Sequence, residues 1–357
     1  MFFLFIGSTG DRAGHSLMTW TIARRLVENG LRVGFMKPFG THPIYSDGLW
    51  KDHDASLFKE VLNLQEPFDR ICPYLVSEES WRQKESEDIL KDIKSLAQEL
   101  SRGKDILLIM GSKHIFFDDT SRAVPDISII NELNADFILI NRYREISRSI
   151  YSILFVRSML KDRIKGIILN RVPPEKLEEI RNQITHSLLQ KGIEITASIP
   201  EDPFLSFRSL REIVEILDGK LLCGEKNLDQ LVGRMTVGST DLKGELLLFK
   251  RVYNKIILLE PFSLDKGMEK PLIQRSIAGI VLTGGRNPAP QILQAAKKAN
   301  LPLLLVNEDT FSILEHLEQS PPRLSPEDES KVRHFTELMD HDGALTRLLQ
   351  STGILSS

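Results

Sequence analysis

The chain is poor in cysteine, in excess charge and in long apolar runs. Among 357 residues only Cys72 and Cys223 are cysteines, and their separation matches no metal spacing or disulfide framework, so we expect a reducing, cytoplasmic location. Lys and Arg number 46 against 49 Asp and Glu, a net charge of −3 that leaves no basic surface for nucleic acid. No apolar run reaches the roughly 18 residues that cross a bilayer. The opening "MFFLFIG" lacks a basic segment before it, so we expect a buried strand rather than a signal peptide, and no membrane partner.

Short apolar runs rich in Ile, Val, Leu and Phe alternate with stretches of helical periodicity through the first part of the chain. The expected strands are residues 2–6, 32–37, 105–110, 136–141, 164–170 and 193–199. The expected helices include residues 15–29, 84–102, 147–160 and 174–190. Strands without polar alternation must be covered on both faces. The pattern therefore predicts an α/β fold, a doubly wound parallel sheet of the P-loop type, over residues 1–215.

A second, smaller α/β series is expected over residues 216–325. Its elements are strands at 255–260, 277–283 and 301–306 and helices near 226–232, 240–251, 287–299 and 309–318. The Pro- and Ser-rich stretch "QSPPRLSPEDES" then interrupts the pattern. Helices near 326–340 and 342–350 follow it, and they predict a C-terminal helical tail over residues 326–357.

The stretch "GSTGDRAGHS", residues 7–16, joins the first strand to the first helix in the manner of a phosphate-binding loop. Glycines let backbone N–H groups turn toward an anion, and the N-terminus of the helix adds partial positive charge. Thr9 stands where the usual spacing has glycine, and His15 stands where it has lysine. Histidine is mostly neutral at pH 7 unless a bound phosphate raises its pKa, whereas Ser16 keeps the hydroxyl that reaches Mg²⁺. A glycine-rich turn that binds no ligand is the alternative.

Further motifs follow in order along the chain. They are "VGFMKPFG" from residue 33, "DHDASLFKEVLNL" from residue 52, "GIILNRVP" from residue 166 and "SIPEDPFLSFRSLREI" from residue 198. With the loop, they resemble the dethiobiotin synthetase-like domain at the N-terminus of long bacterial phosphotransacetylases. "LDKG" from residue 264 and "VLTGGRNPAPQIL" from residue 281 resemble a DRTGG domain. Together the two regions resemble phosphotransacetylase-like, DRTGG-containing proteins that lack the acetyltransferase domain.

The resemblance implies a site for ATP or another purine nucleotide, with Mg²⁺ as its metal. The nucleotide-binding residues that it implies are Thr9, Gly10, Asp11, Arg12, Ala13, Gly14, His15, Ser16, Lys37, Asn170 and Arg171. The metal ligands that it implies are Ser16 and Asp54. The enzymes that this domain resembles have an acidic residue where this chain has Met110 and a lysine where it has His15. We therefore assign no catalytic residue.

Each implied position also has an ordinary structural interpretation. Lys37 is equally compatible with a solvated strand end. Asp54 is a normal N-cap for the helix "ASLFKEVLNL", and Asn170 is a normal turn residue ahead of Pro173. The Thr-Gly-Gly turn of the second domain is compatible with an empty turn.

Phosphoryl transfer depends on positioned charge, and each missing group costs catalysis several kcal/mol, by analogy with single-donor deletions of about 2.7–4 kcal/mol. The sequence therefore favours a non-catalytic or weakly active cytoplasmic regulatory protein that binds a purine nucleotide. Such a protein would signal as a homodimer through its DRTGG domain to an unidentified partner protein. The alternative is an ATP- and Mg²⁺-dependent ligase or carboxylate-activating enzyme, with protonated His15 in place of lysine. A scaffold whose loop binds nothing is the third interpretation.

Overall fold

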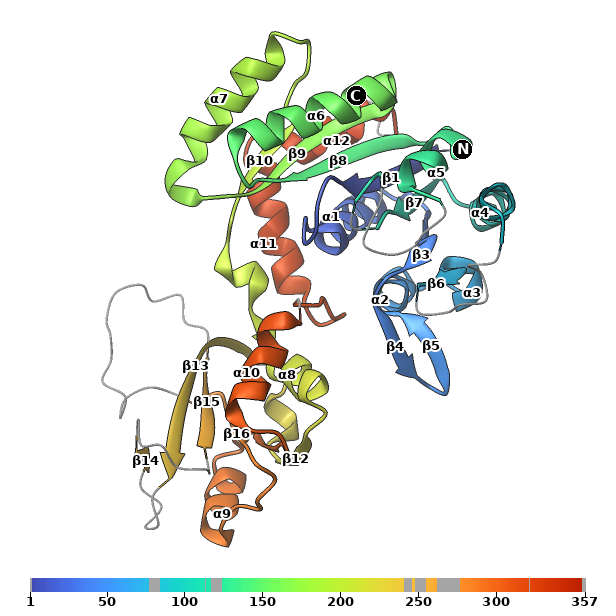
Figure 1. Ribbon diagram of the computed structural model, residues 1–357. Coiled ribbons are helices and arrows are strands. Elements are labelled where there is room, and N and C mark those ends of the chain that lie inside the picture. The colour runs from blue at the N-terminus through green and yellow to red at the C-terminus, as the bar shows by residue number, and fades with distance from the viewer. Residues whose placement is uncertain are drawn as a thin grey trace. The chain divides into compact units, whose positions relative to one another are not determined.

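The computed structural model describes residues 2–76, 84–112, 114–116, 124–240, 246–247, 255–261, 277–320 and 322–354 (Figure 1). The chain divides into two compact units: unit 1 is Met1–Asp202 with Leu324–Ser357, and unit 2 is Pro203–Arg323. This division falls earlier in the chain than the predicted boundary after residue 215, and the stretch predicted as a tail is grouped with unit 1. No helix in the described part of the chain is long and apolar enough to cross a membrane.

Unit 1 is built on a six-stranded, wholly parallel sheet with the order β10-β9-β8-β1-β7-β2. Its strands are β1 (Phe2–Ser8), β2 (Val33–Met36), β7 (Ile106–Met110), β8 (Asp136–Arg142), β9 (Ile164–Val172) and β10 (Ala197–Pro200). Each overlaps one of the six apolar runs of the first series, so the predicted parallel sheet is confirmed; the last strand begins at Ala197, four residues later than predicted. The carboxyl ends of all six strands meet at one edge, with β1 between β7 and β8.

Helices cover this sheet, as its uninterrupted apolar strands require. They are α1 (His15–Glu28), α4 (Ser86–Leu100), α5 (Asp126–Leu133), α6 (Ile146–Leu160), α7 (Leu177–Leu189), α11 (Glu329–Asp340) and α12 (Ala344–Ser351). Buried side chains of α4 to α7 form one core with Phe5 and Phe137 of the sheet. α1 packs against β1 and α11, and an ion pair of 2.8 Å joins Arg25 of α1 to Asp340 of α11. The C-terminal helices are thus part of unit 1.

Between β2 and α4 the chain makes an excursion that carries part of the candidate site. It consists of β3 (Phe39–Gly40) paired with β6 (Tyr74–Leu75), the hairpin of β4 (Pro43–Ser46) and β5 (Leu49–Asp52), and the helices α2 (His53–Val61) and α3 (Phe68–Ile71). At the hairpin tip Asp47 and Gly48 have φ of 52° and 76°, as an Asp-Gly pair adopts in a two-residue turn. The hairpin returns the chain to Pro43, which pairs with Asp52.

Unit 2 contains a mixed sheet with the order β11-β13-β15-β16-β17-β12, and β14 pairs with β13 outside this path. Its elements are β11 (Arg208–Ser209), α8 (Leu210–Leu217), β12 (Lys220–Cys223), β13 (Leu231–Thr240), β14 (Leu246–Leu247), β15 (Lys255–Pro261), β16 (Gly279–Leu282), α9 (Pro290–Lys298), β17 (Leu303–Leu305) and α10 (Thr310–Gln319). The three strands predicted for this region are present, which confirms a second α/β unit.

Two helices predicted for unit 2 are corrected. The prediction of a helix near 226–232 is wrong, because a 3₁₀ turn at Glu225–Asn227 leads into strand β13. Val232 and Val237 of β13 pack into the core of unit 2. The prediction of a helix at 240–251 is wrong for the residues that the structure describes, because Thr240 ends β13 and residues 246–247 form β14. Its other residues lie outside the described ranges.

Candidate functional site

The loop between β1 and α1 lies at the carboxyl edge of the sheet, where side chains of neighbouring strands hold it. Asn170 of β9 donates from Nδ2 to the carbonyl oxygen of Ala13 (2.8 Å). Asn141 of β8, which the sequence motifs did not single out, donates to Thr9 Oγ1 (2.9 Å). Gly14 precedes α1 with φ of 98°, and a Cβ there would stand 2.8 Å from Asn170 Nδ2. The loop therefore requires glycine at residue 14.

His15 follows this glycine and does not carry the charge of the lysine that it replaces. Its Nε2 is buried and makes no hydrogen bond to the described residues. Burial lowers the pKa of His15 from 6.5 to about 4; the charge of Asp54 opposes this effect and that of Lys37 adds to it. Without a bound phosphate His15 is thus neutral at pH 7, so the ligase alternative requires that a phosphate group raise this pKa.

Positive charge near the loop comes instead from arginines. Arg142, at the end of β8, donates from Nη1 to the carbonyl oxygen of Asp11 (3.1 Å). Burial lowers the pKa of Arg171, and the charge of Arg142 lowers it further against the opposing charge of Glu201; Arg12 adds a smaller lowering. These guanidinium groups repel one another, which favours an anion beside the loop. Sequence reasoning missed Arg142, although its place at the end of a parallel strand is a usual one for ligand contacts.

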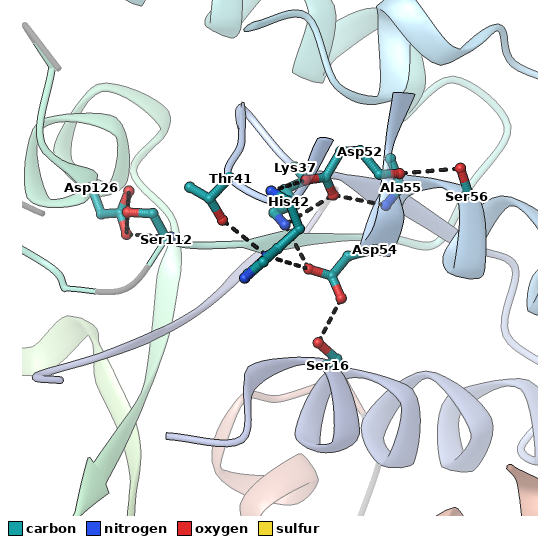
Figure 2. Close-up of polar contacts among 10 residues, drawn as sticks. All are labelled: Ser16, Lys37, Thr41, His42, Asp52, Asp54, Ala55, Ser56, Ser112 and Asp126. Atoms are coloured by element: carbon teal, nitrogen blue, oxygen red, sulfur yellow. Dashed lines mark hydrogen bonds and ion pairs between the residues drawn. The ribbon is translucent and has the colours of Figure 1, made fainter. Parts of the chain in front are cut away.

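A buried group of charged side chains lies beside the first turn of α1 (Figure 2). Lys37, which follows β2, is 2% exposed and donates from Nζ to Asp52 Oδ1 (2.9 Å) and Asp54 Oδ2 (2.5 Å). Asp54 Oδ1 accepts a hydrogen bond from Ser16 Oγ (2.6 Å). We call these four residues the Lys37 network. The interpretation of Lys37 as a solvated strand end is therefore wrong, and the structure brings Ser16, Lys37 and Asp54 together.

The two aspartates of the Lys37 network have different roles. Asp52 is the N-cap of α2, where Oδ1 accepts from the N–H of Ala55 (3.1 Å) and Oδ2 accepts from the N–H of His42 (3.0 Å). Asp54 lies in the first turn of α2, and its carboxylate is directed toward Ser16 (Figure 2). The interpretation of Asp54 as the helix cap is therefore wrong, because Asp52 fills that position.

Lys37 and Asp54 keep their charges at neutral pH. Burial on its own lowers the pKa of Lys37, but the charges of Asp52 and Asp54 raise it above its ordinary value. Burial likewise raises the pKa of Asp54, while the charges of Lys37 and His42 hold it below its ordinary range. The single buried ammonium group of Lys37 therefore pairs with two carboxylates, and its positive charge is already neutralised within the protein.

Two sets of donor atoms in and beside the Lys37 network lie close enough together to face one cation. Donor atoms of His42, Asp52 and Asp54 lie within 4.8 Å of one another, but Lys37 Nζ binds both carboxylates, so this set does not fit a cation. Ser16 Oγ and Asp54 Oδ1 are 2.6 Å apart with no ammonium group between them. This pair fits Mg²⁺, which takes one or two protein oxygens together with phosphate oxygens and water.

An aspartate of helix α5 lies near the end of β7, whereas the enzymes that this domain resembles carry an acidic residue at the end of the strand itself. Met110, which ends the strand, is buried and offers no carboxylate. Asp126, in the first turn of α5, accepts from the N–H of Ser112 (2.8 Å). Asp126 and Ser112 lie apart from the Lys37 network in Figure 2. The sequence motifs did not point to Asp126, because it belongs to α5 and not to the strand where the acid was expected.

The Thr-Gly-Gly turn after β16 is closed by the chain itself. The N–H groups of Gly284 and Gly285 donate to the carbonyl oxygens of Glu308 (2.8 Å) and Val306 (2.9 Å). These two donors are therefore used within unit 2, which favours the interpretation of an empty, structural turn. The "LDKG" motif lies outside the described residues.

A wholly parallel sheet with a glycine-dependent loop between β1 and α1 at its carboxyl edge defines a nucleotide-binding domain of the P-loop type. Residues 3–209, more than half of the chain, match the AAA domain family, and residues 212–320 match the DRTGG domain. The chain therefore belongs to the AAA domain family and carries a DRTGG domain after it. The resemblance drawn from the motifs is confirmed for both regions.

The chain is similar, at low sequence identity, to two kinds of enzyme. A phosphate acetyltransferase of Synechocystis sp. is 26% identical over 374 residues, which cover 98% of this chain and 52% of that protein. An ATP-dependent dethiobiotin synthetase of Brachyspira hyodysenteriae is 24% identical over 241 residues, which cover 64% of this chain and 97% of that protein. Among solved structures, the MinD cell division protein of Aquifex aeolicus has 17% identity and a TM-score of 0.36, covering 57% of this chain and 84% of that one. The chain spans about half the length of the phosphate acetyltransferases it matches.

Proposed function

We propose that the chain is a cytoplasmic regulatory protein that holds ATP or another purine nucleotide on residues 8–16 and turns it over slowly or not at all. The observation that carries this proposal is the construction of the loop, in which Asn170 holds Ala13 and only glycine fits at residue 14. Gly14 brings no side chain to cap α1, and the first turn has no acidic residue. The N–H groups of that turn are therefore suited to a phosphate group, which also gains from the helix dipole.

Charged side chains around the loop are suited to a nucleotide with Mg²⁺. Arg142 and Arg171 supply positive charge on the side of β8 and β9. Ser16 and Asp54 would hold Mg²⁺, which would neutralise phosphate charge next to the loop. The Asn170-Arg171 step lies at the end of β9, where the resemblance places contacts to the purine.

Slow turnover follows from the charges that the site lacks. His15 is neutral at pH 7, Met110 provides no acid, and the ammonium group of Lys37 is shared by two carboxylates. Each missing stabilising group raises the barrier to phosphoryl transfer by several kcal/mol, on the order of the 2.7–4 kcal/mol of single-donor deletions. Binding suffers less, because the backbone N–H groups remain.

The second candidate function is an ATP- and Mg²⁺-dependent ligase or carboxylate-activating enzyme. It is favoured by the similarity to a dethiobiotin synthetase along 97% of that protein and by the meeting of Ser16, Lys37 and Asp54. In this function a bound substrate would draw Lys37 away from one carboxylate. Mg²⁺-dependent consumption of ATP at many turnovers per chain would support it over the regulatory function.

Regulation would act through a conformational equilibrium that the nucleotide shifts, with a changed affinity for a partner protein. The sequence predicts a homodimer formed through the DRTGG domain. In the described part of unit 2 the large apolar side chains that are exposed are those of Ile277 and Phe311. Pairing through this unit stays a prediction.

Calorimetric titration of ATP, ADP and AMP, with and without Mg²⁺, tests the proposal. The variant is Gly14→Ala, whose Cβ would meet Asn170 at a φ of 98°. The matched control is Gly30→Ala, just after the other end of α1 and outside the loop, where φ is also positive (79°) and an added Cβ meets nothing within 4 Å. We expect binding to the wild type and to the control and a loss of binding in Gly14→Ala. Equal binding to all three would place the nucleotide elsewhere, and no binding to the wild type would leave a scaffold.

A further inference from the structure

Three arginines gather where the loop of residues 8–16 meets the ends of strands β8 and β9 (green in Figure 1). Arg142 ends β8, Arg171 lies one residue before the end of β9, and Arg12 belongs to the loop. Burial lowers the pKa of Arg171, and the nearby charges of Arg142 and Arg12 lower it further. The three cations therefore lie close enough to repel one another, and we call them the arginine cluster.

The backbone of two members of the arginine cluster is strained. Arg12 and Arg171 have φ of 52° and 58°, in the left-handed region that residues other than glycine, asparagine and aspartate rarely adopt. At Arg171 the conformation is held by Asn170, whose Oδ1 accepts from the backbone N–H of Arg171 (2.9 Å). Strained backbone of this kind occurs mostly where a ligand is held, so the two arginines are placed as binding residues are.

Most N–H donors of the arginine cluster are not used within the protein. In the part of the chain that the structure describes, Arg12 is exposed and makes no hydrogen bond or ion pair, and Arg142 donates only to the carbonyl oxygen of Asp11. The carboxylate of Glu201, 53% exposed, lies 3.7 Å from Arg171, a contact that contributes little. Guanidinium groups bind phosphate through paired, charged hydrogen bonds, so the unused donors are suited to a phosphate group.

The arginine cluster and the pair suited to Mg²⁺ lie toward opposite edges of the sheet. In the sheet, β8 and β9 follow β1 on one side, and β7 and β2 follow it on the other. Asp54, which contacts Ser16, also contacts Lys37 after β2. A chain of phosphates on the first turn of α1 is therefore matched by Mg²⁺ on the side of β2. The nucleoside then extends toward β9, where the resemblance places the purine, and its ribose lies beside the arginines.

We propose that the arginine cluster binds a second phosphate group, carried on the ribose of the purine nucleotide at its 2′ or 3′ position. This inference rests on the proposed function, because it requires the nucleotide on residues 8–16. It defines the ligand more closely, as a nucleotide with phosphate on both sides of its ribose rather than one with a single chain of phosphates.

Calorimetric titration of isomeric nucleotides into the full chain tests the proposal. ADP carries two phosphates in one chain, whereas adenosine 2′,5′-bisphosphate and adenosine 3′,5′-bisphosphate carry the second phosphate on the ribose. AMP is the common reference, and AMP with added inorganic phosphate shows whether a free phosphate group fills the cluster instead. We expect one of the two bisphosphates to bind roughly 10-fold or more tightly than AMP, the effect of a charged hydrogen bond.

The variants are Arg12→Gln, which breaks no contact within the described residues, and Arg171→Gln. We expect each to lower the affinity for that bisphosphate roughly 10-fold relative to the affinity for ADP. The control is Arg181→Gln on α7, whose guanidinium group contacts Asp342 (3.5 Å) between α11 and α12, and it should leave this ratio unchanged.

The outcomes separate this proposal from the proposed function. A wild type that binds ADP but gains nothing from either ribose phosphate would overturn the second phosphate site and leave the nucleotide on the loop. Equal losses for ADP and the bisphosphate in Arg12→Gln and Arg171→Gln would also overturn it, because the arginines would then bind the phosphate chain. A gain from inorganic phosphate alone would make the anion a free one. A wild type that binds none of these nucleotides would overturn the proposed function as well.

Discussion

Replacing Lys37 by methionine tests whether the Lys37 network holds unit 1 together at its carboxyl edge. Lys37→Met keeps most of the length of the side chain and removes its charge, which leaves the carboxylates of Asp52 and Asp54, 0% and 9% exposed, without their ammonium partner. Breaking one member of such a buried group costs about 3–5 kcal/mol. We therefore expect the free energy of unfolding of unit 1 to fall by about that amount at pH 7.

The assay is urea unfolding of the full chain followed by tryptophan fluorescence. This signal reports on unit 1, because Trp20 and Trp50 lie in its described part and the sequence of unit 2 contains no tryptophan. The control is Lys94→Met, which breaks a half-exposed ion pair with Glu132 (2.8 Å) and should cost about 0–1 kcal/mol.

Two further results follow from the same reasoning. The cost of Lys37→Met should shrink toward pH 5, because without Lys37 the buried Asp54 takes up a proton more readily. Adding Asp54→Asn to Lys37→Met should recover part of the loss, since it removes an unpaired buried charge. A loss no larger than that of Lys94→Met, or two costs that simply add, would refute the role given to the network.

Three more predictions concern the loop and its neighbours. Ser16→Ala removes one of the two oxygens suited to Mg²⁺, so the Mg²⁺-dependent gain in ATP affinity should fall about tenfold, about 1.4 kcal/mol, while the Mg²⁺-free affinity changes little in calorimetry. Asn170→Ala releases the carbonyl of Ala13 and should weaken nucleotide binding roughly tenfold, the effect of one lost hydrogen bond of about 1.4 kcal/mol; an unchanged Kd would argue against a preformed loop. Burial lowers the pKa of His15 from 6.5 to about 4 in the folded chain, so at intermediate pH the unfolded chain binds one more proton than the folded chain. Without ligand, the free energy of unfolding should therefore fall by up to about 3 kcal/mol as the pH falls from about 6.5 to 4. In urea titrations His15→Gln should remove this loss.

The parallel sheet was predictable because its strands are buried on both faces and appear as short apolar runs in the sequence. The hairpin β4–β5 also had a signal, the Asp47-Gly48 pair, although the motifs drew attention to Lys37 and Asp54 on either side of it. β13 was missed because two glycines and several polar residues interrupt its apolar pattern, and pairing with β15 rather than local preference fixes it as a strand.

Three of the side chains named from the sequence meet in the structure, but the contacts among them were not predictable. The family resemblance points to Ser16, Lys37 and Asp54. The choice of Asp52 as the helix cap has no such signal, because either aspartate in "DHDA" could cap the helix. The packing of α11 on α1 depends on contacts such as Arg25–Asp340. These contacts join distant parts of the chain, so no local sequence pattern predicts them. The contact of Arg142 with the loop at Asp11 and that of Asp126 with Ser112 at the end of β7 likewise join distant parts of the chain and have no local signal.

The central claim is that the loop binds a nucleotide that the site barely consumes. It is tested most directly by mixing a small amount of ATP with excess wild-type chain and Mg²⁺, then measuring bound ATP and released phosphate in the same sample, with Gly14→Ala beside it. The account predicts that the wild type retains the ATP intact over many minutes and that Gly14→Ala retains none. Rapid phosphate release by the wild type would contradict the absence of catalysis, and equal retention by both proteins would contradict the assignment of the nucleotide to the loop.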